Sequence, residues 1–406
     1  MADDAAVRGK TAAGALGAGL GAGLAGGAVA IGRYYATVLL DPTRVVAYPE
    51  RVLGVGDGTV TLATSRLVRQ PGVWGLRWTA PPADSAGVPV VGSAGVPMVG
   101  SASVPMVGSA SEGLAVVGDI LRDDRHGVRR RLLSGPVPPV GPAVVDAGPY
   151  DPDPGARGLE FTEVTVDTPL GPAPAWEIPA ERDVWAIAVH GRGGRRREAL
   201  RILPTLHALG LPTLVISYRN DDEAPPSPDG AFHLGDTEWE DLEAAVGYAR
   251  GRGARRIVLV GWSMGAAISG AFLDRSPAAD LVDAVVWDAP LLDWRATLRR
   301  QARNRLLPPA LVPIAEVSAR RRIGIDFDHF DLVRHPPARR PPTLVIHSVP
   351  DTAVPIGTAR TLAARSRDLD WPVRLLEVDG VEHTGSWNAD PERYDRAVTA
   401  FLTDTL

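Results

Sequence analysis

The chain has 406 residues, of which 45% are hydrophobic, 22% charged and 6% aromatic, and its formal net charge is −5. At about 150 residues per domain this length predicts two or three domains, enough to bury a substantial core. The acidic balance argues against a nucleic acid as the main partner, because phosphate backbones select clustered positive charge. The absence of cysteine excludes disulfides, thiolate nucleophiles, iron–sulfur clusters and cysteine-bound zinc.

An uncharged Gly/Ala-rich segment, residues 11–32, dominates the N-terminal stretch 1–40. As a helix it would span roughly the 30 Å of a bilayer core, and its glycines recur four residues apart, a spacing that lets transmembrane helices approach closely. A cleaved signal peptide with an A-x-A site at 28–30 and a flexible tail are the alternatives. We expect a single-pass anchor at the cell membrane with the catalytic part outside the cytoplasm, or a secreted protein.

Residues 41–150 are expected to form a small β-rich domain, because polar and apolar residues alternate at 59–62 and 74–78 between Gly/Pro turns. An octapeptide occurs three times in tandem at 85–108, with a proline in each copy, which predicts a surface loop instead of a solenoid. The proline-rich stretch 135–154 is typical of a semi-rigid linker.

Residues 155–406 show apolar runs that alternate with helical stretches. The predicted strands are 184–189, 213–217, 257–260, 284–287, 343–347 and 373–378, and the predicted helices are 195–209, 237–251, 266–273, 356–366 and 391–402. Such alternation predicts an α/β fold with a doubly wound, mostly parallel sheet and helices on both faces.

The motif GWSMG at 261–265 lies between a predicted strand and a helix of small residues. A nucleophile elbow needs a strained turn directly after a strand, with glycine two residues before and two after the serine, and Gly261 and Gly265 meet that requirement. The turn would expose the Ser263 hydroxyl and direct the Met264 amide, at the helix N-terminus, toward a developing oxyanion.

A serine hydroxyl needs a base within reach and a group that orients the base. His383 follows the last apolar run and is the predicted base. Asp351 follows the run at 343–347 and is the predicted orienting acid, which would hold the His383 tautomer and stabilise the imidazolium. Asp288, after the preceding strand, competes for that role.

The motif HGRGG at 190–194 follows another apolar strand and supplies a glycine-rich loop. Its backbone amides can turn inward, so the Arg192 N–H is the predicted second oxyanion donor, with Gly193 as the alternative. His190 and Gly191 begin this loop, and we expect His190 to fix it through a hydrogen bond. The alternative is that His190 is an ordinary histidine at the end of a strand.

Together, the HGRGG loop, the GWSMG elbow, Asp351 and the late His383 closely resemble the α/β-hydrolase superfamily, in its serine-esterase and peptidase-like branch. The resemblance covers about residues 161–406, and the chain order Ser, Asp, His is the one that superfamily uses. It implies a triad of Ser263, His383 and Asp351, an oxyanion hole from the Arg192 and Met264 amides, and no cofactor.

An insertion at 292–338 separates two predicted strands, where such hydrolases often carry a cap. Its leucines are interleaved with arginines, so it is interpreted as an amphipathic lid or as ordinary helices beside the sheet. The acidic loop at 326–331 has metal-capable side chains but no known ligand spacing, and we predict no metal site.

The sequence therefore predicts a serine hydrolase that cleaves small carboxylic esters through an acyl-enzyme. A peptidase or amidase that uses the same triad is the nearest alternative, because one set of groups serves both bonds. A non-catalytic scaffold that retains the fold is the alternative from another class.

Overall fold

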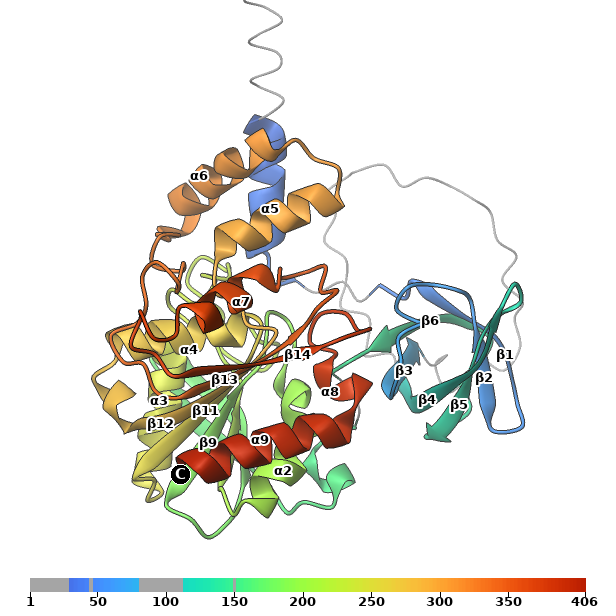
Figure 1. Cartoon of the computed structure of the whole chain (residues 1–406), viewed down its shortest axis with the longest axis horizontal. Helices are drawn as coiled ribbons and strands as arrows, with labels where there is room; N and C mark the ends of the chain where they lie inside the picture. Colours follow the sequence, from blue (N-terminus) through green and yellow to red (C-terminus); the bar gives the residue numbers. More distant parts are fainter. Residues whose placement is uncertain (1–28, 44–46, 80–111, 149–150) are drawn as a thin grey trace, which may run out of the picture. The chain divides into compact units, whose positions relative to one another are not determined.

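The computed structural model describes residues 29–43, 47–79, 112–148 and 151–406 (Figure 1). The chain divides into two compact units: unit 1 comprises Met1–Val45 with Pro152–Leu406, and unit 2 comprises Val46–Asp151. Unit 2 is therefore inserted between two segments of unit 1. The octapeptide repeat at 85–108 and residues 11–28 of the predicted anchor lie outside the described residues.

Unit 1 is built on an eight-stranded sheet with the order β14-β13-β12-β11-β9-β10-β8-β7. The strands are β7 (Thr162–Thr168), β8 (Gly171–Ile178), β9 (Val184–Val189), β10 (Thr213–Ile216), β11 (Arg256–Trp262), β12 (Val282–Asp288), β13 (Thr343–Ser348) and β14 (Val373–Val378). β8 pairs antiparallel with β7 and β10, whereas the other neighbouring pairs in this sheet are parallel. The predicted mostly parallel sheet is confirmed.

Helices cover both faces of this sheet (Figure 1). α3 (Trp239–Gly251) and α4 (Met264–Arg275) lie on one face, and α2 (Leu203–Ala208) and α9 (Pro391–Thr405) lie on the other. The remaining short elements are η1 (Pro154–Arg157), η2 (Arg196–Arg201), η3 (Pro277–Leu281), α7 (Gly357–Ala364) and α8 (Ser386–Ala389). With both faces covered, β9, β11 and β13 are buried along nearly their whole lengths, as expected of a parallel sheet.

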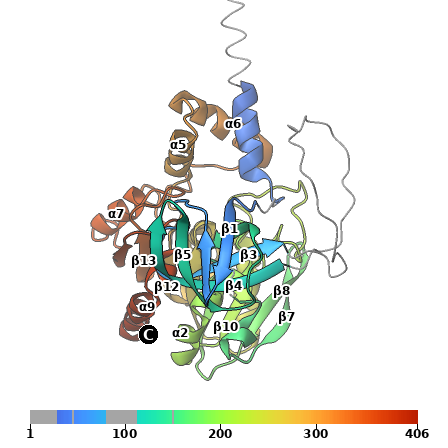
Figure 2. The same cartoon turned by 90° about the vertical axis from the view of Figure 1, so that its right-hand side faces the viewer.

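A helix over residues 29–40 also belongs to unit 1. It lies beside the insertion between β12 and β13, which forms α5 (Trp294–Asn304), η4 (Pro309–Leu311) and α6 (Val312–Ile323) (Figures 1 and 2). A Cβ on Gly32 would lie 2.5 Å from Cγ2 of Ile314, so this helix and α6 are in close contact. Ala36 and Leu40 are buried in the main core.

This helix differs from the sequence-based expectation, which treated residues 1–40 as a separate segment. Its last residues pack into the core of unit 1, and this contact has no local sequence signal. Among the helices that the structure describes, none combines the length and apolar character needed to cross a bilayer.

Unit 2 contains a closed six-stranded barrel with the order β1-β2-β5-β4-β3-β6. The strands are β1 (Glu50–Gly56), β2 (Thr59–Leu62), β3 (Trp74–Thr79), β4 (Glu112–Asp124), β5 (Gly127–Ser134) and β6 (Gly141–Asp146). Arg130 on β5 is fully buried and donates hydrogen bonds to the carbonyls of Gly118, Val68, Gln70 and Gly72. These bonds satisfy the buried guanidinium and fix the loop at 68–72.

Candidate active site

Ser263 occupies a sharp turn between β11 and α4, with φ 50° and ψ −112°. Few residues other than glycine adopt a positive φ. A Cβ on Gly265 would collide with the carbonyl oxygen of Val189 on β9, and a Cβ on Gly261 would lie 3.0 Å from the backbone of Gly265. Glycine at both positions lets the turn pack against the sheet and present Ser263 at the carboxyl edge of the parallel strands.

The structure brings Ser263, His383 and Asp351 together, although 120 positions separate the first two. The Ser263 Oγ lies 2.8 Å from Nε2 of His383, and Nδ1 of His383 lies 2.7 Å from Oδ2 of Asp351. A carboxylate only accepts, so Nδ1 carries the proton and Nε2 accepts from the serine hydroxyl. This is the tautomer in which the imidazole can take the proton of Ser263.

Asp351 is buried, and each of its oxygens is held. Oδ1 accepts from the amides of Ala353 at 2.7 Å and Val354 at 2.9 Å, while Nε2 of His347 lies 3.3 Å from Oδ2. Burial disfavours the charged carboxylate, but the charge and hydrogen bonds of His383 and His347 outweigh it and hold the pKa of Asp351 well below its usual range. The carboxylate is therefore ionised at any working pH.

Asp288 ends β12 and is also buried, yet it makes no hydrogen bond with His383. Burial raises the pKa of Asp288 to about 6. Of the two acids considered from the sequence, Asp351 is the one that accepts the hydrogen bond from Nδ1 of His383.

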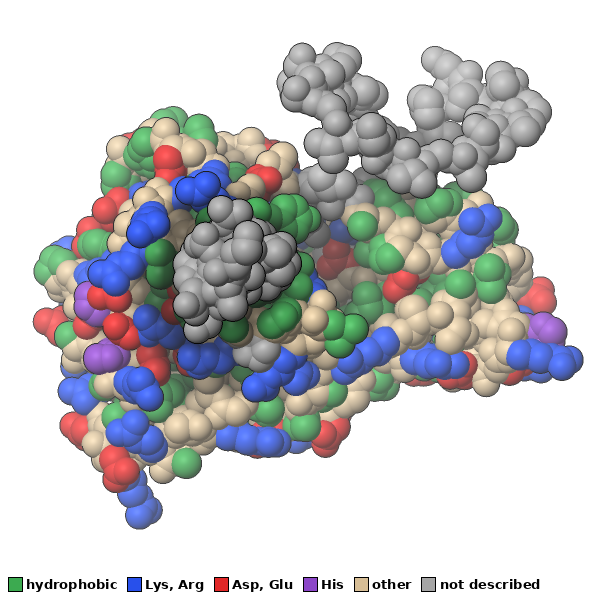
Figure 3. Space-filling model, turned by 90° about the horizontal axis from the view of Figure 1, so that it is seen from above, with side chains coloured by type: hydrophobic (Ala, Val, Ile, Leu, Met, Phe, Trp, Pro, Cys, Tyr) green, Lys and Arg blue, Asp and Glu red, His purple; other side chains and the backbone are tan. Residues whose placement is uncertain are grey.

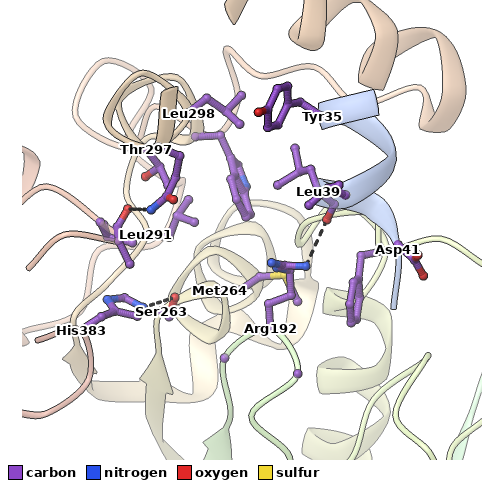
Figure 4. A pocket seen from close by; sticks show the side chains of 18 of the residues that line it. Tyr35, Leu39, Asp41, Arg192, Ser263, Met264, Leu291, Thr297, Leu298 and His383 are labelled. Atoms are coloured by element: carbon purple, nitrogen blue, oxygen red, sulfur yellow. Dashed lines mark hydrogen bonds between the residues drawn. The ribbon is translucent and has the colours of Figure 1, made fainter. Parts of the chain in front are cut away.

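The loop at 190–194 lies next to Ser263, since a Cβ on Gly191 would lie 3.1 Å from the Ser263 Cβ. The backbone amides of Arg192 and Met264 donate no hydrogen bond to any residue that the structure describes. Two such amides close to a serine hydroxyl are suited to stabilise a developing oxyanion. The Arg192 side chain instead reaches upward, toward the carbonyl of Leu39 (Figure 4).

His190 is fully buried and fixes this loop. Nδ1 lies 2.8 Å from the carbonyl oxygen of Gly191, and Nε2 lies 2.8 Å from Oδ2 of Asp221. Both partners are acceptors, an arrangement that favours the protonated ring; burial opposes this charge, but Asp221 and the hydrogen bonds raise the pKa of His190. Tyr218 stacks on the ring with 4.3 Å between centroids.

Two further buried residues, Glu198 and Arg201, were not predicted from the sequence. Glu198 accepts from the Gly191 amide at 2.6 Å, while Nη1 of Arg201 donates to the carbonyl of Thr384 at 2.5 Å. Nη2 of Arg201 lies 3.7 Å from Glu198, so this pair links the loop at 190–194 to the loop that carries His383. No local signal sets this pair apart in the sequence, because three further arginines at 195–197 directly precede Glu198.

A cavity of about 740 Å³ opens above Ser263 and His383. Leu298 of α5 and Tyr35 and Leu39 of the helix over 29–40 surround this space (Figure 4). Its volume lies within the range of about 300–1,000 Å³ that is typical of small-molecule sites. In the part of the chain that the structure describes, no cluster of three His, Asp or Glu side chains is placed to hold a metal ion.

Comparisons with known proteins place part of this chain beside a known family. The sequence model of the prolyl oligopeptidase family, Peptidase S9, matches residues 228–406, which include Ser263, Asp351 and His383. No curated protein matches the sequence.

Solved structures of one esterase show the same fold at low sequence identity. An esterase of Pyrococcus furiosus is 20% identical with a TM-score of 0.51, over 63% of this chain and 96% of that chain. Another crystal form of that esterase gives 21% identity and a TM-score of 0.50, over 63% and 94% of the two chains. An alpha-beta hydrolase from Vibrio vulnificus is 17% identical with a TM-score of 0.47, over 61% of this chain and 83% of that chain.

Proposed function

We propose that this chain, a member of the α/β-hydrolase superfamily and an enzyme of that class, hydrolyses carboxylic esters through an acyl-enzyme. The observation that carries the proposal is the hydrogen-bonded line from Ser263 through His383 to Asp351, with distances of 2.8 and 2.7 Å. A hydroxyl on a strained turn, a base and an ionised acid in this order are the groups that acyl transfer requires.

In the first step Ser263 Oγ attacks the ester carbonyl carbon, and Nε2 of His383 takes the hydroxyl proton. The ionised Asp351 holds Nδ1–H and stabilises the imidazolium that forms. The amides of Arg192 and Met264 donate to the oxyanion of the tetrahedral intermediate. When this collapses, Nε2 returns the proton to the departing alcohol and leaves the acyl group on Ser263.

In the second step a water molecule replaces the alcohol. His383 takes a proton from the water as it attacks the acyl carbon, and the same two amides stabilise the second oxyanion. Collapse breaks the bond to Ser263 Oγ, which recovers its proton from His383 and releases the carboxylic acid.

Peptide or amide hydrolysis is the second candidate, and the match of residues 228–406 to the prolyl oligopeptidase family favours it. The same triad can protonate an amine leaving group. The difference between the two reactions lies in the substrate that the cavity accepts.

The proposal is tested by comparing kcat/KM for p-nitrophenyl butyrate and for aminoacyl p-nitroanilides, together with labelling by a fluorophosphonate probe. We expect labelling and a higher kcat/KM for the ester, and prior treatment with unlabelled fluorophosphonate should abolish both. A higher kcat/KM for the anilides would support the peptidase. A chain that is neither labelled nor active on either substrate would refute both candidates.

Activity should depend on pH through His383. Burial opposes protonation of this histidine, but the charge and hydrogen bond of Asp351 outweigh burial and raise the pKa of His383 above its ordinary value of 6.5. Only the neutral ring accepts the serine proton, so kcat/KM should fall on the acidic side with a midpoint above 6.5. A pH series, corrected for spontaneous ester hydrolysis, measures the midpoint; a value below 6.5 would contradict the raised pKa.

We also propose that the chain acts at the outer side of the cell membrane or is secreted, on the strength of the uncharged residues 11–32. Residues 29–32 of this segment begin the helix over 29–40. Cleavage after Ala30 would keep Tyr35, Val38 and Leu39, which line the cavity. The anchored chain and the cleaved, secreted chain would therefore both retain this wall of the cavity.

A further inference from the structure

The cavity above Ser263 is closed by segments that lie far apart in the sequence. Leu298 comes from α5 and Val312 from α6, whereas Tyr35, Val38 and Leu39 come from the helix over 29–40. That helix precedes unit 2 in the chain, and the elements that carry the triad follow it. The N-terminal helix therefore contributes a wall to the substrate cavity.

The position of this wall indicates which part of an ester it contacts. His383 must return a proton to the departing alcohol, so the alcohol lies on the His383 side of Ser263. Figure 4 shows His383 on one side of Ser263, with Leu39 and Tyr35 on the other side and above. The group directed toward the helix is then the acyl chain.

The chemistry of the wall fits an apolar acyl chain. Leu39 of the N-terminal helix, Leu298 of α5 and Leu311 of η4 line the same cavity. An acyl chain that packs against these leucines removes apolar surface from water, and its binding becomes more favourable in proportion to the area buried. A cavity of about 740 Å³ offers far more space than an acetyl group fills.

Several contacts hold the helix over the cavity. The Phe232 amide donates to the carbonyl of Leu40 at 2.8 Å, and Nη1 of Arg192 lies 3.5 Å from the carbonyl oxygen of Leu39. The Arg305 guanidinium lies 6.0 Å from the centre of the Tyr35 ring. Arg192 thus joins the loop beside Ser263 to the end of the helix, and its positive charge suits the negative end of the helix dipole.

Resting on the proposed esterase function, we propose that the helix over 29–40 is the specificity wall for the acyl group, and that the enzyme prefers esters of medium-length aliphatic acids. Leu39 is the specificity-determining residue, because its side chain faces the cavity. Enlarging this side chain shortens the acyl chain that fits, and truncating it lengthens that chain.

The same helix provides a matched control. Ile31 is 41% exposed and does not line the cavity. Figure 3 looks onto the end of unit 1 that carries this helix and α6, where hydrophobic and basic side chains adjoin. The large exposed hydrophobic side chains of these two helices are Val29, Ile31, Tyr34, Val38 and Val317. Because Ile31 lies outside the cavity, Ile31→Trp and Ile31→Ala change side-chain volume on this helix as the Leu39 substitutions do, but they leave the cavity unchanged.

The experiment measures kcat/KM for p-nitrophenyl acetate, octanoate and dodecanoate with the full chain. For the wild type we expect octanoate to exceed acetate. Leu39→Trp should lower the octanoate-to-acetate ratio at least tenfold, and Leu39→Ala should raise the dodecanoate-to-octanoate ratio. The same substitutions of Ile31 should leave both ratios at their wild-type values.

Failure of this inference is distinguishable from failure of the esterase proposal. A wild type that hydrolyses none of the esters refutes the esterase. A wild type that is active but shows equal ratios in the Leu39 and Ile31 variants refutes the specificity wall alone. If Leu39→Trp does not fold, as judged by thermal unfolding, Leu39→Ala decides, because it removes volume.

Discussion

Replacing Ser263 by alanine should lower kcat/KM for a p-nitrophenyl ester by about four to six orders of magnitude and abolish labelling by a fluorophosphonate. Without Oγ no acyl-enzyme can form, and His383 has no hydroxyl proton to accept. Any residual rate would come from binding and from the amides of Arg192 and Met264. Both effects are read in one preparation, by steady-state kinetics and by gel fluorescence.

Ser269 provides the matched control. It also lies on α4, is fully buried, and donates to the carbonyl of Gly265 at 2.7 Å within the helix. Ser269→Ala removes the same atom from the same helix, so we expect activity and labelling close to those of the wild type. If Ser263→Ala retained wild-type activity, or if Ser269→Ala caused the larger loss, Ser263 would not be the nucleophile.

Replacing Asp351 by asparagine should lower kcat by about four orders of magnitude with little change in fold. Oδ1 of Asp351 accepts from the amides of Ala353 and Val354, so the side-chain oxygen of asparagine would keep that position. Its NH₂ group would then face Nδ1 of His383 and favour the tautomer protonated at Nε2. That tautomer cannot accept the serine proton.

The control for this prediction is Asp288→Asn, the same change at the acid that competes for the role. Because Asp288 makes no hydrogen bond with His383, we expect this variant to keep more than about a tenth of the wild-type activity, a loss far below that from a wrong tautomer. Steady-state kinetics on the same ester and thermal unfolding of both variants measure the difference. A larger loss of activity from Asp288→Asn than from Asp351→Asn would assign the orienting role to Asp288.

Much of unit 1 could be predicted because its signals are local. The apolar runs at 184–189 and 343–347 coincide with β9 and β13, since buried parallel strands are apolar on both faces. Ser263, Asp351 and His383 could be named because each directly follows a strand or an apolar run. The structure brings these three side chains together at one edge of the sheet.

The strands β7 and β8 could not be predicted in this way. β7 lies at the edge of the sheet with alternating polar residues, and β8 contains Pro172 and Pro174, which are unusual within a strand. Both pair in an antiparallel hairpin that continues the sheet beyond β10. Their formation depends on that neighbour more than on their own apolar pattern.

The cavity wall and the buried Glu198–Arg201 pair lacked a local signal for a different reason. The contact between Arg192 and Leu39 joins residues 153 positions apart. The hydrogen bond from Arg201 to Thr384 spans 183 positions. The helix over 29–40 is held by its contacts with α6 and with the main core, which no local sequence pattern reveals.

The insertion of unit 2 into unit 1 has a consequence for synthesis on the ribosome. The strands of unit 2 all come from residues 50–146, so this barrel can close as soon as they have emerged. The helix over 29–40 emerges earlier, but α6 and the sheet on which it packs come last. At about 5–20 residues per second this helix waits on the order of half a minute without its partners. During that interval Ala36 and Leu40 lack the neighbours that bury them in the folded unit, whereas the barrel has all of its strands.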